Sequence, residues 1–246
     1  MELRREQFSG KRYEFANVVV LVPLVVSGWL IIAATAKAQD AVPANQEPRH
    51  RVKLQNEYVR IIDVEVPAGE ATLYHTHSLD YPYVMVTDAL LKNDVPGKPP
   101  VDLKITQGLI GYYRASQGAY THRFVNAGSG TFRAIGIELL KPAPSSVQVV
   151  SPLPDVAGYK TVLDNERVRG YLVSLEPGQS VGPVTLAGPG IRVVLTGGKV
   201  EQRGVDGKVA TLDLTPAQFA WRESTAAQSL TNVGGSKVEI VEFELK

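Results

Sequence analysis

The 246-residue chain contains one pattern twice, and this internal repeat constrains its fold more than any other feature. The segment LQNEYVR at residues 54–60 recurs as LDNERVR at residues 163–169, an offset of 109 residues. Further along, NAG at residues 126–128 recurs as NVG at residues 232–234, an offset of 106 residues that a short loop deletion would produce. A period near 100 residues is too long for a solenoid and indicates a duplicated domain.

Each copy has the local pattern of short β-strands. Residues 59–66 (VRIIDVEV) are rich in β-branched residues and end at the turn sequence PAG. Residues 83–86, 192–195 and 238–243 are similar apolar or β-branched runs, and no stretch after residue 40 has a sustained helical period. The 22 glycines and 16 prolines are spread along the chain, as many tight turns require. The sequence therefore predicts an all-β protein with two tandem sandwiches or jelly-roll barrels.

The first 38 residues have the features of an export signal. Four basic residues up to Arg12 precede an apolar run from Val18 to Ala34, which predicts a signal helix. The small-x-small sequence AKA at residues 36–38 predicts cleavage before Gln39, a periplasmic or secreted mature protein, and no stable membrane association after signal removal. The alternative is an uncleaved anchor, because the run is near the lower length limit for a membrane span.

The composition excludes several classes of protein. The chain has no cysteine, which excludes disulfides, thiolate metal sites and cysteine nucleophiles. The formal net charge of +1 gives no electrostatic reason to expect nucleic acid as a partner. We therefore expect a small-molecule ligand and no nucleic acid.

Three histidines have the spacing of a metal site. His75 and His77 are separated by one residue, so on a strand both side chains point to the same face. His122, on a later predicted strand, could supply a third imidazole. Three neutral imidazoles with open positions suit one divalent transition metal such as Fe, Mn, Ni, Cu or Zn. Alternatively, these histidines line a polar cavity without a metal. The remaining histidine, His50, precedes the first predicted strand and is expected at the surface.

These residues resemble the two motifs of the cupin family. Gly69-x5-His75-x-His77 is similar to the first motif, and Gly111-x10-His122-x3-Asn126 is similar to the second. The resemblance covers residues 50–141 directly and residues 160–246 through the repeat. It implies two tandem cupin barrels (double-stranded β-helices) at residues 50–145 and 155–246, after a signal peptide at 1–38 and a linker at 39–49. It also implies self-association as a homodimer.

The sequence departs from the cupin motifs at the usual fourth ligand. The family places a glutamate four or five residues after the second histidine, where this chain has Tyr81 or Pro82. Asp80 is the nearest carboxylate, but a shift of one residue turns a strand side chain to the other face. Asp80 therefore remains a candidate ligand beside a three-histidine site of the kind used by some non-haem iron cupin dioxygenases. Tyr81 and Tyr83 are candidate substrate-binding residues, and Arg114 is a candidate clamp for an anionic substrate.

The second copy has lost this histidine pattern. At the repeat offset Val184 and Leu186 replace His75 and His77, Gln228 falls near the place of His122, and no histidine follows. We expect a degenerate barrel with an apolar interior and a packing role, with Trp221 in the core or at an interface.

Three functions fit the sequence. The first is an exported metalloenzyme acting on a small molecule, such as a dioxygenase-like oxygenase, an isomerase or a hydrolase. The second is a non-catalytic protein that binds a metal or a small ligand. The third is an interaction module in which the degenerate barrel docks on the first barrel or on another subunit.

Overall fold

The computed structural model describes residues 40–144, 158–223 and 227–246. The predicted signal helix and most of the proline-rich join between the two copies lie outside these described residues. The described residues form strands and two short 3₁₀ helices, which confirms the predicted all-β class, and all of them belong to one compact unit, Gln39–Lys246. Within the described part, no helix has the length and apolar character needed to cross a bilayer.

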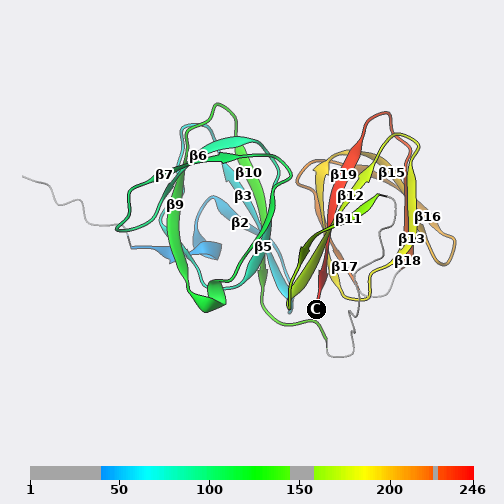
Figure 1. The fold of residues 1–246 in the computed structure, drawn as a ribbon, viewed down its shortest axis with the longest axis horizontal. Helices are drawn as coiled ribbons and strands as arrows, with labels where there is room; N and C mark the ends of the chain where they lie inside the picture. The colour runs from blue at the N-terminus through cyan, green and yellow to red at the C-terminus, as the bar shows by residue number, and fades with distance from the viewer. Residues whose placement is uncertain (1–39, 145–157, 224–226) are drawn as a thin grey trace, which may run out of the picture. The chain divides into compact units, whose positions relative to one another are not determined.

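Two five-stranded sheets form the first barrel (Figure 1). Their strand orders are β2-β3-β10-β5-β8 and β1-β4-β9-β6-β7. The elements are β1 (Val42–Pro43), η1 (Ala44–Gln46), β2 (His50–Gln55), β3 (Val59–Val66), β4 (His75–His77), β5 (Tyr81–Met85), β6 (Ala89–Asp94), β7 (Val101–Ile105), β8 (Ile110–Tyr113), η2 (Ala115–Gln117), β9 (Tyr120–Asn126) and β10 (Phe132–Leu139). Residues 39–49, expected as a linker, include β1 and η1, so this segment contributes to the first barrel.

A five-stranded and a four-stranded sheet form the second barrel. Their strand orders are β11-β12-β19-β14-β17 and β13-β18-β15-β16. The elements are β11 (Tyr159–Asp164), β12 (Val168–Leu175), β13 (Ser180–Thr185), β14 (Gly190–Thr196), β15 (Gly198–Gly204), β16 (Val209–Leu214), β17 (Phe219–Arg222), β18 (Ala227–Asn232) and β19 (Val238–Leu245). The order β2-β3-β10-β5-β8 thus recurs as β11-β12-β19-β14-β17, so the sequence repeat is also a repeat of topology.

The glycine and the asparagine that match the two motifs in the first copy, Gly69 and Asn126, build a turn. The Gly69 amide donates to the Asn126 carbonyl oxygen (2.9 Å), and Asn126 Nδ2 donates to the carbonyl oxygens of Val66 and Gly130 (2.8 Å each). Gly69 has a φ of +75°, a conformation that strains residues with a side chain. The Asn126 side chain is fully buried, so it satisfies backbone groups that water cannot reach.

The second copy repeats this turn. The Gly178 amide donates to the Asn232 carbonyl oxygen (2.9 Å), and Asn232 Nδ2 donates to the carbonyl oxygens of Leu175 (2.9 Å) and Ser236 (2.8 Å). Gly178 has a φ of +77°. Because the second copy lacks the histidines but keeps this glycine and this asparagine, we assign these two motif positions to the fold rather than to the metal site.

β3 is buried or half-buried along both of its faces, although it contains Arg60, Asp63 and Glu65. Ile62, Val64 and Val66 pack in a cluster within the first barrel, whereas Val59 and Ile61 belong to a cluster that also contains residues of the second barrel. This shared cluster includes the following residues: Val59, Ile61, Val84, Ile135, Ile137, Val168, Ile191, Val193, Val241 and Phe243.

Aromatic and polar contacts accompany the shared cluster. The rings of Tyr58 and Trp221 stack with centroids 6.1 Å apart and an angle of 4° between their planes. Gln107 Nε2 donates to the Leu195 carbonyl oxygen at 3.3 Å. The prediction that Trp221 lies in the core or at an interface is therefore confirmed.

Candidate metal centre

The three predicted histidines come together on neighbouring strands. His75 and His77 are on β4, and the antiparallel pairing of β4 with β9 places His122 directly opposite His75. The ring centroid of His75 lies 5.0 Å from that of His77 and 4.5 Å from that of His122. The centroids of His77 and His122 are 5.3 Å apart. All three side chains are buried. Alternation along the strand and cross-strand pairing are sufficient to produce this cluster.

His50 also belongs to this cluster, so the prediction that it lies at the surface is wrong. It is 4% exposed, and its ring centroid lies 4.3 Å from that of His75 and 6.0 Å from that of His77. One ring nitrogen each of His50, His75 and His77 lie within 4.8 Å of one another. The side chain turns inward because β2 pairs with β3, opposite Val64, a residue of the apolar cluster inside the barrel.

Hydrogen bonds fix the orientation of two of the imidazoles. His75 Nδ1 donates to the Leu73 carbonyl oxygen, and His122 Nδ1 donates to Asn93 Oδ1, both at 2.9 Å. Each ring therefore keeps a lone pair on Nε2. Within the described residues, His75 Nε2, His122 Nε2 and His77 Nδ1 are buried and have no hydrogen-bond partner. Buried polar atoms are rarely left unpaired, and metal-binding histidines are commonly oriented in this way through their other ring nitrogen.

Burial keeps these imidazoles neutral. It lowers the pKa of His75 to about 4, with a further contribution from His50. The pKa values of His77 and His122 fall to about 2, again mainly through burial and then through the neighbouring histidines. At neutral pH the rings are uncharged, which is the form that binds metal ions. The neutral imidazoles of this cluster therefore fit a divalent transition metal as ligands.

A cavity of about 560 Å³ adjoins the histidines inside the first barrel. Its wall includes His50, His77 and His122. The rest is mostly aromatic or aliphatic, and the remaining lining residues include Tyr81, Tyr83, Met85, Leu91, Leu103, Ile105, Tyr113, Tyr120, Phe124 and Phe132. A concave apolar site with a few polar groups is typical of small-molecule binding.

Two of the three predicted substrate-binding residues line this cavity. Tyr81 and Tyr83 are in the wall, and the Tyr81 ring stacks on His77 with centroids 4.5 Å apart. Burial raises the pKa of Tyr81, so its hydroxyl stays protonated. Arg114 is not in the wall: its exposed guanidinium forms an ion pair with Glu166 at 2.6 Å. The expectation of an anion clamp at Arg114 is therefore corrected, since this side chain bonds to the second barrel.

Asp80 is engaged away from the histidines. Its Oδ1 accepts a hydrogen bond from the Ser116 amide (2.8 Å), and its Oδ2 accepts one from the Tyr112 hydroxyl (3.0 Å). Burial alone would raise the pKa of Asp80, but these hydrogen bonds bring it below its ordinary value. We assign Asp80 a role in holding η2 rather than in the metal centre.

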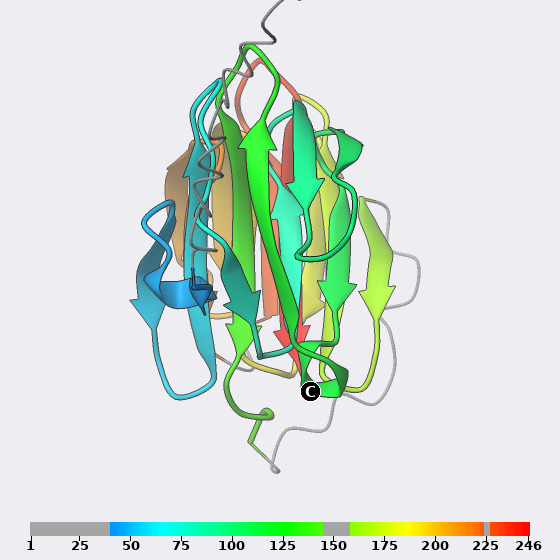
Figure 2. The same ribbon diagram turned by 90° about the vertical axis from the view of Figure 1, so that its left-hand side faces the viewer.

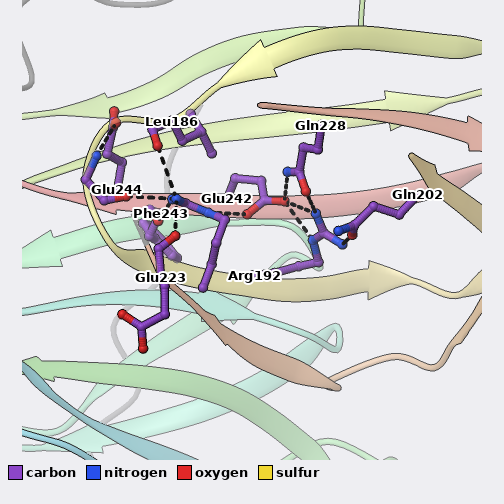
Figure 3. A network of polar contacts seen from close by, with 10 residues as sticks. Leu186, Arg192, Gln202, Glu223, Gln228, Glu242, Phe243 and Glu244 are labelled. Atoms are coloured by element: carbon purple, nitrogen blue, oxygen red, sulfur yellow. Dashed lines mark hydrogen bonds and ion pairs between the residues drawn. The ribbon is translucent and has the colours of Figure 1, made fainter. Parts of the chain in front are cut away.

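Next to the place that corresponds to the histidines, the second barrel holds a buried ion pair (Figure 3). Gln228 lies opposite Val184, in the register that His122 and His75 have in the first barrel. Arg192 Nε donates to Glu242 Oε1 (2.7 Å), and its Nη2 donates to Gln228 Oε1 (3.1 Å). Glu242 is fully buried. The predicted apolar interior is confirmed where Val184 and Leu186 replace the histidines, because both are buried in an apolar cluster of the second barrel. The sequence did not predict the ion pair across β14 and β19, where two opposite charges are buried together.

Comparison with known proteins identifies the fold. No family model matches the sequence, and no curated protein matches it significantly. A salicylate 1,2-dioxygenase from Pseudaminobacter salicylatoxidans has a similar structure, with a TM-score of 0.54 and 13% identity over 80% of this chain and 76% of that chain. AerE from Microcystis aeruginosa gives a TM-score of 0.52 and 13% identity over 81% of this chain and 98% of that chain.

A single cupin domain from Bordetella pertussis Tohama I is 24% identical over 41% of this chain and 97% of its own, with a TM-score of 0.34. The chain has the cupin fold in its two-barrel form, as its motifs predicted, with a cluster of buried histidines in the first barrel.

Proposed function

We propose that the first barrel binds one divalent transition metal through His75, His77 and His122 and acts on a small molecule in the adjoining cavity. The observation that carries this proposal is the set of three buried imidazole nitrogens that have no hydrogen-bond partner. The fold likeness to a salicylate 1,2-dioxygenase supports a dioxygenase-like reaction. A bound metal would supply Lewis-acid or redox chemistry and open positions for a substrate.

The cavity wall favours a neutral, largely apolar or aromatic substrate. Among the described residues that line the cavity, Lys104 is the one lysine or arginine. The lining carboxylate of Glu138 already forms an ion pair with Arg60 at 2.6 Å. Aromatic walls exclude water and stack against a planar molecule. Tyr120 accepts a hydrogen bond from Asn93 Nδ2 (2.8 Å), so its own hydroxyl proton can be donated to a substrate oxygen.

A binding protein without turnover is the second candidate. Among the described potential ligands, the cluster around His75 contains histidines and no carboxylate. The cupin motif normally supplies a glutamate here, and its loss is compatible with metal or ligand sequestration. We further propose export to the periplasm or the medium, on the sequence of residues 1–38, and self-association as a homodimer.

Metal content tests the proposal. The full chain is purified after expression in medium containing Fe, Mn, Ni, Cu and Zn, and metal is measured by mass spectrometry. We expect about one equivalent in the wild type and loss of most of it in the His75→Ala, His77→Ala double variant. Gln228→Ala, at the equivalent of His122 in the second barrel, is the matched control and should retain the metal. A metal-free wild type would contradict the proposal.

Oxygen uptake then separates the two candidates. The metal-loaded protein is offered a panel of phenols, catechols and β-diketones. Consumption of oxygen that the double variant lacks supports an oxygenase. Stoichiometric metal without any turnover supports the binding protein.

A further inference from the structure

We infer that His50 is a fourth ligand of the metal centre, supplied by the segment before the first cupin motif, where the motif itself lacks its carboxylate. The inference rests on the proposed metal site. It adds a residue that the motif does not contain.

The segment that contains His50 is fixed against the strand of His75 and His77. Val42 on β1 pairs in parallel with His75, and the Val42 amide donates to the Tyr74 carbonyl oxygen at 3.0 Å. The short helix η1 follows, and His50 begins β2. Figure 2, which faces the first barrel, shows this N-terminal segment in blue at its edge. The backbone therefore holds His50 beside β4 through hydrogen bonds that do not involve its side chain.

A buried carboxylate fixes the tautomer of His50. Glu47 is 2% exposed, and its Oε2 accepts hydrogen bonds from His50 Nδ1 (2.6 Å) and the Arg49 amide (2.7 Å). Its Oε1 accepts one from the Leu73 amide (3.0 Å). With Nδ1 donating to Glu47, the lone pair of His50 is on Nε2, as in the carboxylate–histidine–metal arrangement.

His50 lies within reach of the same ion as its neighbours. Its ring centroid is 4.3 Å from that of His75, and one nitrogen each of His50, His75 and His77 lie within 4.8 Å of one another. Two ligands about 2.1 Å from one ion are at most about 4.2 Å apart, so these three nitrogens would move closer together to share an ion. His50 also lines the cavity that His77 and His122 line. Asp80 has both oxygens engaged elsewhere, which leaves His50 as the fourth donor.

Copper binding to the full chain tests the inference. Cu(II) is added to the metal-free protein, the bound imidazoles are counted by pulsed EPR, and the dissociation constant is measured by competition with a chelator. We expect four imidazoles in the wild type and three in His50→Gln. The glutamine amide can still donate to Glu47, so the buried carboxylate keeps a partner, and circular dichroism verifies the fold. We expect Glu47→Gln to weaken binding by about 10–100-fold and His50→Gln by at least as much.

Arg49→Ala is the matched control in the same segment. The Arg49 side chain forms an ion pair with Glu70 at the surface, so this variant should bind copper like the wild type. Three imidazoles in both the wild type and His50→Gln, with unchanged affinity, would overturn the inference and leave the proposed metal site standing. A wild type that binds no copper would overturn both. His50→Ala provides a second variant if His50→Gln does not fold.

Discussion

The two barrels keep the same turns but differ in what fills their interiors. Asn126 and Asn232 make the same backbone hydrogen bonds, whereas the place of His75 and His122 is taken by Val184 and Gln228. The turn positions serve the backbone, which both barrels need. The inward-facing side chains are histidines in the first barrel, whereas Val184 and Gln228 take their places in the second. The duplicated chain has therefore diverged at positions whose side chains point into the barrel.

One cross-strand pair explains why the first barrel has its cavity at this place. Tyr83 lies opposite Gly136 in β5 and β10, whereas the equivalent pair in β14 and β19 is Arg192 and Glu242. Gly136 has no side chain to occupy the space, and it lines the cavity. In the second barrel two long charged side chains occupy that volume; they form an ion pair, and Arg192 also donates to Gln202 and Gln228. One barrel therefore presents unpaired imidazoles to a cavity, and the other has a closed ion pair.

Acidification should lower the free energy of unfolding most, because the buried histidines of the first barrel are neutral when folded. The folded pKa values of His75 (about 4), His77 and His122 (about 2 each) lie below the ordinary 6.5. Below pH 6.5 the unfolded chain therefore binds more protons than the folded chain, and stability falls as the pH falls towards the folded pKa values. From pH 7 to pH 5 we expect the metal-free protein to lose about 1–2 kcal/mol per histidine, about 3–6 kcal/mol in all.

Urea unfolding at pH 7, 6 and 5 in the presence of a chelator measures this loss. The triple variant His75→Gln, His77→Gln, His122→Gln is the control and should be nearly independent of pH over this interval. The second barrel has no histidine, so the effect arises in the first. A wild type as insensitive as the triple variant would contradict the buried, neutral state of the cluster.

Removing one charge from the second barrel should have the next largest effect. Glu242→Gln removes the carboxylate that pairs with Arg192 (2.6 Å) and Arg222 (3.9 Å). Arg192 then keeps only uncharged partners in the interior, and we expect the free energy of unfolding to fall by about 3–5 kcal/mol. Asp213→Asn removes a carboxylate from an exposed pair with Lys199 (3.7 Å) and should leave stability unchanged. Urea unfolding at pH 7 measures both. Equal effects of the two variants would show that the interior pair is not desolvated.

Replacing the shared asparagines should have the smallest effect and the same size in both barrels. Asn126→Ala and Asn232→Ala each remove matching hydrogen bonds and leave buried carbonyl oxygens unpaired, at a cost of about 2–4 kcal/mol each. Copper binding by Asn232→Ala should equal that of the wild type, because this turn lies in the barrel without histidines. A much smaller cost in one barrel would mean that its turn is not the structural equivalent of the other.

The sequence alone determined the features that depend on neighbouring residues. Turn residues such as Gly69 impose a backbone conformation locally, and the alternation of a strand places His75 and His77 on one face. The internal repeat predicted the duplicated topology and showed that the second copy has no histidines at the equivalent positions. These features needed no knowledge of which distant strands pair.

Only the tertiary structure decided which side chains meet across distant strands. His50 is buried because β2 pairs with β3 and because Glu47 accepts its hydrogen bond. Arg192 could be buried because Glu242 faces it from a strand about 50 residues away. Arg114 forms an ion pair with Glu166 and does not line the cavity. Burial of a charged or polar side chain depends on the partner that compensates it, and strand pairing, not local sequence, supplies that partner.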